Sequence, residues 1–240
     1  FHSSAGQLRD LYRFVAPRKF VASRRELVTA GFTVPRIRNW NRNGRLITVV
    51  RSVYSYGRDI ESREAAMRVG LAAAGPGSVL TGASACEIWG IVEPKTLLPR
   101  QVIVAATSGR ARTLAGLSPA LQNTSLHVVK RSIEGHEIRV KDGLEVVNPT
   151  LALIEFSADA SDRQVRFAFL EACRQGHFSE ADLVYCYTRL VGRPGAERLR
   201  PYLALWVPEL TRTKSVYEGW VIIEWVPTGW PMPLVNHTIL

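Results

Sequence analysis

The amino-acid sequence predicts an α+β fold, on three observations. The chain has 240 residues, of which 46% are hydrophobic, so it holds enough apolar material for a packed core. Short β-rich runs are mixed with helices before residue 148, and helical patterns dominate after it. The excess positive charge lies almost entirely in the first quarter of the chain. We therefore expect an N-terminal domain over residues 1–60, an α+β domain over 61–210, and a short helix–strand tail over 211–240.

The charge of the N-terminal quarter is the strongest compositional signal. The whole chain has a formal net charge of +10, and residues 1–60 contribute +9 of it. This range contains only three acidic side chains, Asp10, Glu26 and Asp59, against twelve basic ones. The basic side chains are Arg9, Arg13, Arg18, Lys19, Arg24, Arg25, Arg36, Arg38, Arg42, Arg45, Arg51 and Arg58. Such a patch attracts polyanions, either nucleic acid or an anionic membrane surface. Arginine suits bidentate contacts with phosphate and guanine, although a GC-rich genome produces the same preference for arginine over lysine.

The first 60 residues are predicted to form a winged helix-turn-helix. One apolar helical face runs from Leu8 to Val15 and ends before Pro17. A Ser-x-x-Glu capping box at Ser23 opens a second helix. A third helix is expected over residues 34–43, capped by Thr33 and ended by Gly44. The β-rich runs 46–50 and 53–56, with Arg51-Ser52 at the bend, complete the pattern as a hairpin wing.

The third helix carries the candidate DNA contacts. At 100° per residue, Ile37 and Trp40 point to the core, whereas Arg38, Asn39 and Arg42 point away from it. Arginine and asparagine pair bidentately with guanine and adenine in the major groove. Exposed helices ordinarily mix charges of both signs, and this one has no acidic residue. A solvated basic face without a partner is the alternative interpretation. The predicted DNA-binding residues are Arg24, Arg25, Arg36, Arg38, Asn39, Asn41, Arg42, Arg45 and Arg51. Those before and after the third helix are assigned to phosphates, which set register without reading sequence.

The region 61–210 alternates helices and strands before it becomes helical. A helix opened by Ser62 should end at Gly75-Pro76-Gly77, and Asn148-Pro149 should open another that runs through residue 156. Strands are expected at 78–80, 101–106, 126–130, 138–140 and 144–147, the last two as a hairpin around Asp142-Gly143. The remaining helices are expected at 83–89, 162–174, 180–190 and 195–205.

No motif in the chain indicates catalysis, a cofactor or a metal site. The glycine-rich stretches match neither a dinucleotide fingerprint nor a P-loop. The histidines His127, His136 and His177 have no partner at ligand spacing, and Ser84 has no G-x-S-x-G context. The expected protein is therefore an interaction module rather than an enzyme.

The cysteines and the hydropathy favour the cytoplasm. Cys86, Cys173 and Cys186 are far apart and odd in number, which is typical of buried free thiols in a reducing compartment. No run of 18 apolar residues exists, so no transmembrane span is expected. The first residues also have no apolar signal core.

Several of these landmarks, in this order and spacing, resemble the AbiEi family, the type IV antitoxins of AbiE-type abortive-infection systems, in its actinobacterial form. The matching pieces are Asn43-Gly44-Arg45, Arg51-Ser52-Val53-Tyr54, the run from Gly75 to Ala85, Trp89-Gly90, Asp142-Gly143-Leu144, Asn148-Pro149-Thr150 and Arg193-Pro194-Gly195-Ala196. The resemblance implies a winged helix that represses its own operon by binding promoter DNA, with inverted repeats as the expected operator. It also implies a second, antitoxin-like domain that neutralises a nucleotidyltransferase-like toxin in a phage-defence system. Only the basic third-helix and wing residues inherit a role from it.

The tail over 211–240 resembles the start of a Vsr-like, PD-(D/E)xK nuclease-type module. A capping box at Ser215–Glu218 should open a helix to about Trp225, and a strand is expected over 234–240. Glu218 would match the acidic residue of that module's first helix. The metal-binding Asp and the E-x-K strand are missing from the chain, and without them no metal site forms. Glu218 is therefore expected to be a helix cap.

Three functions from different classes follow. The preferred one is a DNA-binding repressor and antitoxin. The second is a Vsr-like endonuclease-related protein whose catalytic half is missing. The third is an RNA-binding or membrane-surface module, which the polar third-helix face disfavours because RNA recognition needs exposed aromatics and membrane helices need apolar ones beside the arginines.

Overall fold

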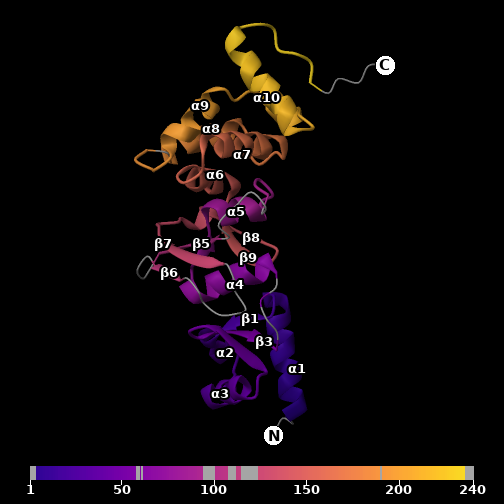
Figure 1. The fold of residues 1–240 in the computed structure, drawn as a ribbon, viewed down its shortest axis with the longest axis vertical. Helices are drawn as coiled ribbons and strands as arrows, with labels where there is room; N and C mark the ends of the chain where they lie inside the picture. The colour runs from indigo at the N-terminus through magenta and orange to yellow at the C-terminus, as the bar shows by residue number, and fades with distance from the viewer. Residues whose placement is uncertain are drawn as a thin grey trace, which may run out of the picture. The chain divides into compact units, whose positions relative to one another are not determined.

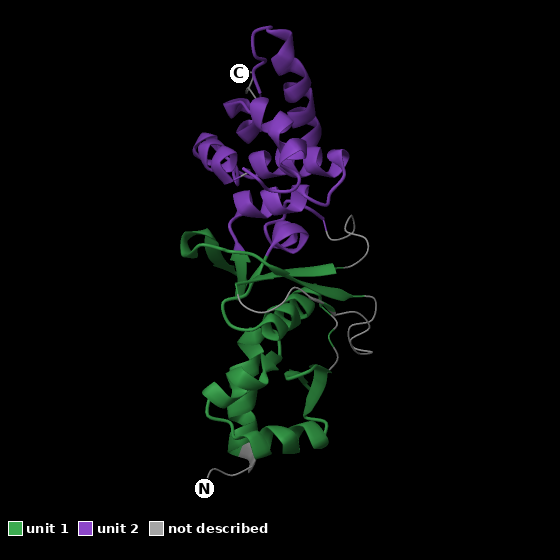
Figure 2. Ribbon diagram, turned by 90° about the vertical axis from the view of Figure 1, so that its left-hand side faces the viewer, with its two compact units in different colours: residues 1–80, 98–146 green, residues 81–97, 147–240 purple. Residues whose placement is uncertain are grey.

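The computed structural model describes residues 4–57, 60, 62–93, 101–107, 112–114, 124–189 and 191–235, and within them the fold is α+β, as predicted. The chain divides into two compact units (Figure 2). Unit 1 comprises residues 1–80 and 98–146, and unit 2 comprises residues 81–97 and 147–240. Unit 1 thus combines the expected N-terminal domain with the strands of the expected second domain.

Unit 1 begins with the elements of a winged helix-turn-helix (Figure 1). Its three strands form an antiparallel sheet in the order β1-β3-β2. The bounds are α1 Ser4–Val15, η1 Ala16–Arg18, β1 Val21–Ser23, α2 Arg24–Thr29, α3 Val34–Arg42, β2 Leu46–Val50 and β3 Val53–Tyr56. The sequence analysis missed β1 and the 3-10 turn η1, and it placed the other elements correctly.

The helix boundaries follow the predicted caps, with one correction. Ser23 Oγ accepts a hydrogen bond from the Glu26 amide at 3.2 Å, and Glu26 Oε2 accepts one from the Ser23 amide at 2.7 Å, so the capping box is complete. Gly44 follows α3 with φ +69°, a conformation that glycine adopts without strain. Thr33 occupies the cap position of α3, but its side chain makes no cap hydrogen bond, so that part of the prediction was wrong. Pro35 at the second helical position has no N–H, so of the two amides from which a cap side chain usually accepts, only that of Arg36 is present.

A compact apolar core holds these first helices together. Phe32 contacts Trp40 edge-to-face at a centroid distance of 5.4 Å, and Phe14 contacts Phe32 at 6.0 Å. The buried residues of this core are Leu11, Val15, Ala22, Leu27, Phe32, Ile37, Trp40 and Leu46. They come from α1, α2 and α3, from the loop before α3, from the middle of β1 and from the start of β2, so the position of α3 is set by tertiary packing.

The rest of unit 1 is a six-stranded mixed sheet with one long helix against it. The strand order is β6-β7-β5-β4-β9-β8, with β5 parallel to β7 and β4 parallel to β9. The bounds are α4 Arg63–Ala74, β4 Val79–Leu80, β5 Gln101–Ala106, β6 Arg112–Leu114, β7 Ser125–Lys130, β8 Ile138–Lys141 and β9 Leu144–Val147. A Cβ on Gly70 of α4 would lie only 2.8 Å from a Val102 methyl group, so a glycine is needed for this close approach of helix and sheet.

Helix α4 joins the two parts of unit 1. It packs on β5 and β7 and also on β1, β2 and β3. On the winged-helix side, the nearly buried guanidinium of Arg68 pairs with the carboxylate of Glu26. Glu26 therefore caps α2 with one oxygen and holds α4 with the other. A cut at residue 60 would separate these partners.

Unit 2 is helical and confirms the predicted helices. Their bounds are α5 Gly82–Ile88, α6 Pro149–Ser157, α7 Asp162–Arg174, α8 Glu180–Arg189, α9 Ala196–Ala204 and α10 Val216–Trp225, with 3-10 turns η5 Pro208–Arg212 and η6 Val226–Thr228. The Asn148 side chain caps α6, as predicted, by accepting from the Leu151 amide at 2.8 Å. Helix α6 is buried on nearly every side and packs against α5, α7, α8 and α9, so it forms the centre of this unit.

The tail differs from its prediction in two details. Ser215 caps α10 as expected, but Glu218 Oε2 accepts from the Lys214 amide rather than from that of Ser215, so the reciprocal box does not close. The expected strand over 234–240 is absent at residues 234–235, and its remainder lies outside the described residues. Within the described ranges, no helix is both long and apolar enough to cross a membrane.

Candidate nucleic-acid interface

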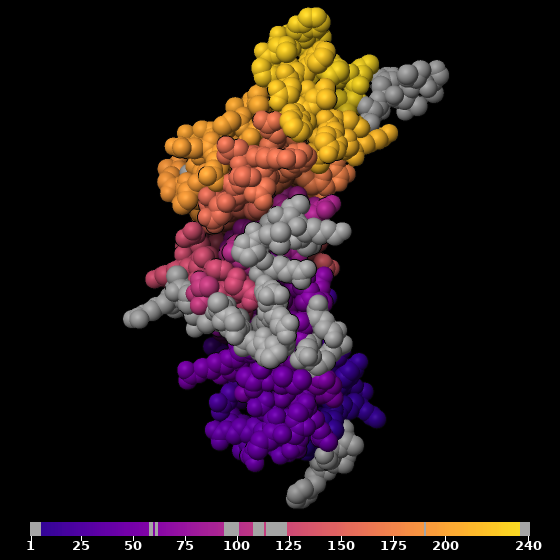
Figure 3. Space-filling model, in the orientation of Figure 1, coloured from indigo at the N-terminus to yellow at the C-terminus, as the bar shows by residue number. Residues whose placement is uncertain are grey.

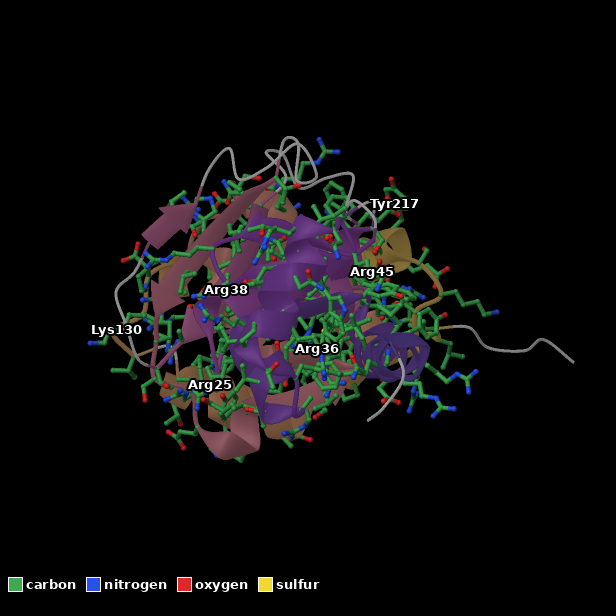
Figure 4. All side chains as sticks on the ribbon, turned by 90° about the horizontal axis from the view of Figure 1, so that it is seen from below. Arg25, Arg36, Arg38, Arg45, Lys130 and Tyr217 are labelled. Carbon is green, nitrogen blue, oxygen red and sulfur yellow. The ribbon has the colours of Figure 1, made fainter. Side chains whose placement is uncertain are left out.

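Helix α3 presents the predicted side chains as the helical spacing requires. Ile37 and Trp40 are buried, with 1% and 4% of their surface exposed, whereas Arg38, Asn39 and Arg42 are all exposed. Figure 4 views the molecule from below and labels Arg25, Arg36, Arg38 and Arg45 among the side chains of this part of unit 1. The aromatic packing of Trp40 therefore fixes one face of the helix and leaves the polar face outward.

The positive charge of this face is not neutralised. Within the part of the chain that the structure describes, none of the nine predicted DNA-binding residues forms an ion pair with a carboxylate. Glu26 is the nearest acidic side chain in sequence to Arg24 and Arg25, and it is engaged with Ser23 and Arg68 instead. Unpaired guanidinium groups remain available for phosphates or base edges.

Two of the asparagines accept a hydrogen bond from within the domain. Asn41 Oδ1 accepts from the Thr48 hydroxyl on β2 at 3.0 Å, and Asn39 Oδ1 lies 3.5 Å from the side-chain nitrogen Nδ2 of Asn43. Arginine has donors only. The outward face of α3 therefore presents N–H donors, and Asn41 is partly turned toward the hairpin.

The sheet brings the hairpin bend to the start of α2. The Arg24 amide donates to the Ser52 carbonyl at 2.7 Å, and Ser23 pairs with Val53 across β1 and β3. Arg51 at the bend is exposed, and Ser52 has φ +66°. Arg24 and Arg25 at the start of α2 and Arg51 at the bend therefore lie on adjoining segments, and we call these three residues the α2 cluster. Sequence reasoning assigned all three to phosphates but missed β1, whose pairing places them together.

Arg45 and Arg36 occupy separate positions. Arg45 is exposed and follows α3 at the opposite end of β2 from the bend. Arg36 is half-buried and lines a hollow of about 380 Å³ together with Asp10 and Phe14 of α1. Arg36 therefore lies on the flank of α3 nearest α1, away from the outward face.

The three histidines considered as metal ligands contact neighbouring side chains or backbone carbonyls instead. His177 Nε2 lies 3.1 Å from the Trp89 carbonyl, and both ring nitrogens of His127 contact hydroxyl groups, of Thr113 and Ser125. His136 is exposed, with Nδ1 3.4 Å from a Glu134 carboxylate oxygen. Among the described residues, no group of three histidine, cysteine or acidic side chains is placed to hold a metal.

The three cysteines are free and buried, as predicted. Burial raises the pKa of the Cys186 thiol to about 12, and it also raises the pKa of Cys86 and Cys173. A thiol is nucleophilic only as the thiolate, so these side chains serve packing.

Comparison with known proteins assigns no family to this chain. No protein-family model and no curated protein matches it. Among solved structures, the chain is similar to the RV2827C protein from Mycobacterium tuberculosis, with 17% sequence identity and a TM-score of 0.49 over 90% of this chain and 80% of that one. This likeness is too distant to indicate a function.

Proposed function

We propose that this protein binds double-stranded DNA through α3 and represses transcription from its own promoter in the cytoplasm. The observation that carries the proposal is the outward face of α3, where exposed Arg38, Asn39 and Arg42 have no carboxylate partner in the described chain while Ile37 and Trp40 anchor the helix. A helix of nine residues is about 13 Å long, which suits insertion of its polar face into a major groove.

The donor character of this face favours guanine. In the major groove guanine offers two acceptors, O6 and N7, whereas adenine offers one acceptor and one donor. An asparagine reads adenine by accepting from the amino group of the base, and the oxygen of Asn41 already accepts one hydrogen bond, from Thr48, which leaves a single lone pair. We therefore propose a half-site whose central contacts are guanines. The α2 cluster and Arg45 supply phosphate contacts on either side of the helix.

The test is a fluorescence anisotropy titration of the full chain on duplex DNA from its own promoter. The double variant Arg38→Ala/Arg42→Ala should lose at least roughly a hundredfold in affinity, because two base-reading arginines are removed. Arg200→Ala is the matched control, since Arg200 is an exposed arginine on α9 outside the proposed interface. Equal affinities of the double variant and the control would contradict the proposal, as would wild-type binding no tighter than to unrelated DNA.

The antitoxin role rests on the family resemblance alone. We propose that a nucleotidyltransferase-like toxin is neutralised outside the α3 face, so that repression and protection are separable. A truncation at residue 60 is a poor test because it separates Glu26 from Arg68 and α4 from β1–β3. The Arg38→Ala/Arg42→Ala variant should instead lose repression yet still protect cells that express the neighbouring toxin gene. Loss of both activities in a folded variant would refute the separation.

We also propose that this chain does not cleave DNA. The carboxylate of Glu218 accepts a hydrogen bond from the Lys214 amide just before α10, so it is engaged with the backbone at the helix start. Plasmid incubated with the protein and Mg²⁺ or Mn²⁺ should stay intact. Cleavage that disappears in Glu218→Ala would favour the endonuclease-related alternative.

A further inference from the structure

The last described segment gathers exposed apolar side chains. Ten large hydrophobic residues are exposed in the described part of the chain, and four of them lie within this one segment. These four are Tyr217 at 70%, Val221 at 60%, Trp230 at 69% and Leu234 at 79%. Exposed apolar side chains gathered in this way commonly mark an interaction surface. In the space-filling view the residues of α10, coloured yellow, form an open surface of unit 2 (Figure 3).

Helix α10 is apolar on two faces. Its inner face packs on α7: Ile222 and Ile223 are buried, and a Cβ on Gly219 would lie 3.2 Å from Leu170. Its outer face lines a shallow hollow of about 470 Å³. This outer stripe consists of Tyr217, Trp220, Val221, Glu224 and Trp225 of α10 and Thr228 of η6. Successive members of the stripe are alternately three residues and one residue apart, which is the spacing of a helix face that packs against another helix.

The charges of this segment disfavour a polyanionic partner. No lysine or arginine follows Lys214, so DNA or an anionic membrane finds few cations here. The two carboxylates that follow Lys214 are engaged within the chain. Glu218 accepts from the Lys214 amide, and Glu224 accepts from Trp220 Nε1 at 3.1 Å and lies 3.7 Å from Arg166. A second copy of the same stripe would therefore bring no unpaired charge against it.

The stripe also matches itself when reversed. Its spacing reads the same from either end, so in an antiparallel pair related by a two-fold axis each stripe position lies opposite another stripe position of the second copy. Tyr217 then lies opposite Thr228 of the second copy, a large side chain against a small one. Trp220 meets Trp225 of the second copy, and Val221 meets Glu224 of the second copy.

We infer that a second copy of this chain covers the outer stripe of α10, as an antiparallel helix pair across a two-fold axis. The inference goes beyond DNA binding and does not depend on it.

The first test is sedimentation velocity of the full chain from about 1 µM to about 100 µM, a range that reveals micromolar self-association. The wild-type protein should shift from monomer to dimer. Val221→Glu should raise the dimer Kd at least roughly tenfold, because it places an unpaired charge in the pair. Val184→Glu is the matched control: Val184 is 73% exposed on α8, and this variant should dimerise as the wild type does. Both positions are exposed, so both variants should fold, which circular dichroism checks.

Cysteine cross-linking tests the antiparallel arrangement. Tyr217→Cys mixed with Thr228→Cys should give a disulfide-linked dimer, and each variant alone should give little, because the native cysteines are buried. Efficient linking of Tyr217→Cys to itself would overturn the antiparallel form. A wild-type chain that stays monomeric over the whole concentration range would overturn the inference. So would a wild-type chain that binds phosphatidylglycerol vesicles as a monomer. A Val221→Glu chain that dimerises as the wild type does would overturn it as well.

Discussion

Helices α3 and α10 have nearly the same length, nine and ten residues, yet they present opposite chemistry. Each is held by a pair of buried side chains, Ile37 with Trp40 in α3 and Ile222 with Ile223 in α10. Outward, α3 presents arginine and asparagine, whereas α10 presents aromatic residues and valine. In both helices the buried residues and the outward residues have separate roles. Buried residues position a helix, and the outward residue types determine which class of partner it suits.

The largest expected effect tests whether the two buried pairs stabilise their helices to the same degree. Trp40→Ala should lower the free energy of unfolding by about 3–5 kcal/mol, because Trp40 fills the core beside Phe32. Ile223→Ala should cost about 2–5 kcal/mol through the contact of α10 with α7. Urea unfolding followed by circular dichroism measures both. A cost near zero for either would mean that its helix is held by something other than the buried pair.

A smaller effect on DNA affinity tests whether the outward faces of α3 and α10 serve different partners. Arg42→Ala should weaken binding to promoter DNA by about 1–3 kcal/mol and relax specificity at one base pair. It should change the stability of the fold by no more than about 0.5 kcal/mol, because Arg42 is exposed. Self-association through α10 should be unchanged. If neither Arg42→Ala nor Arg51→Ala loses affinity in a folded protein, the basic face is solvated or serves another partner.

The α2 cluster should behave differently from α3. Arg51→Ala removes a proposed phosphate contact at the hairpin bend, so it should weaken all duplex sequences alike and lower the slope of log affinity against log salt by about one unit. Titrations at several salt concentrations, on promoter and unrelated DNA, give this slope. A sequence-selective loss would instead assign Arg51 to a base.

The smallest expected effect tests the donor character of α3. Thr48→Val removes the hydroxyl that engages Asn41 Oδ1, and so frees that oxygen to accept from adenine. Affinity for the wild-type operator should change less than about twofold, while the penalty for adenine at one position should fall by up to about 1 kcal/mol. The readout is a set of duplexes with single base-pair changes. An unchanged specificity profile would show that Asn41 does not face the groove.

Much of the local structure of this protein could be read from the sequence. The capping box at Ser23, the glycine after α3 and the burial of Ile37 and Trp40 were all predicted, because caps and helical periodicity depend on residues only a few positions apart. The outward placement of Arg38, Asn39 and Arg42 follows from the same periodicity. Their role in DNA binding stays a prediction, as does the family resemblance.

Only the tertiary structure decided which distant residues meet. The three residues of β1 are too few to give a pattern of their own, and they form a strand because β3 lies beside them. That pairing gathers the α2 cluster from two segments, and the packing of α4 on both sheets joins the first 60 residues to the next strands through Arg68 and Glu26. The hydrogen bond between Asn41 and Thr48, which engages one acceptor atom of α3, likewise depends on where β2 returns past the helix. Such contacts follow from how whole elements pack, and no local spacing in the sequence encodes them.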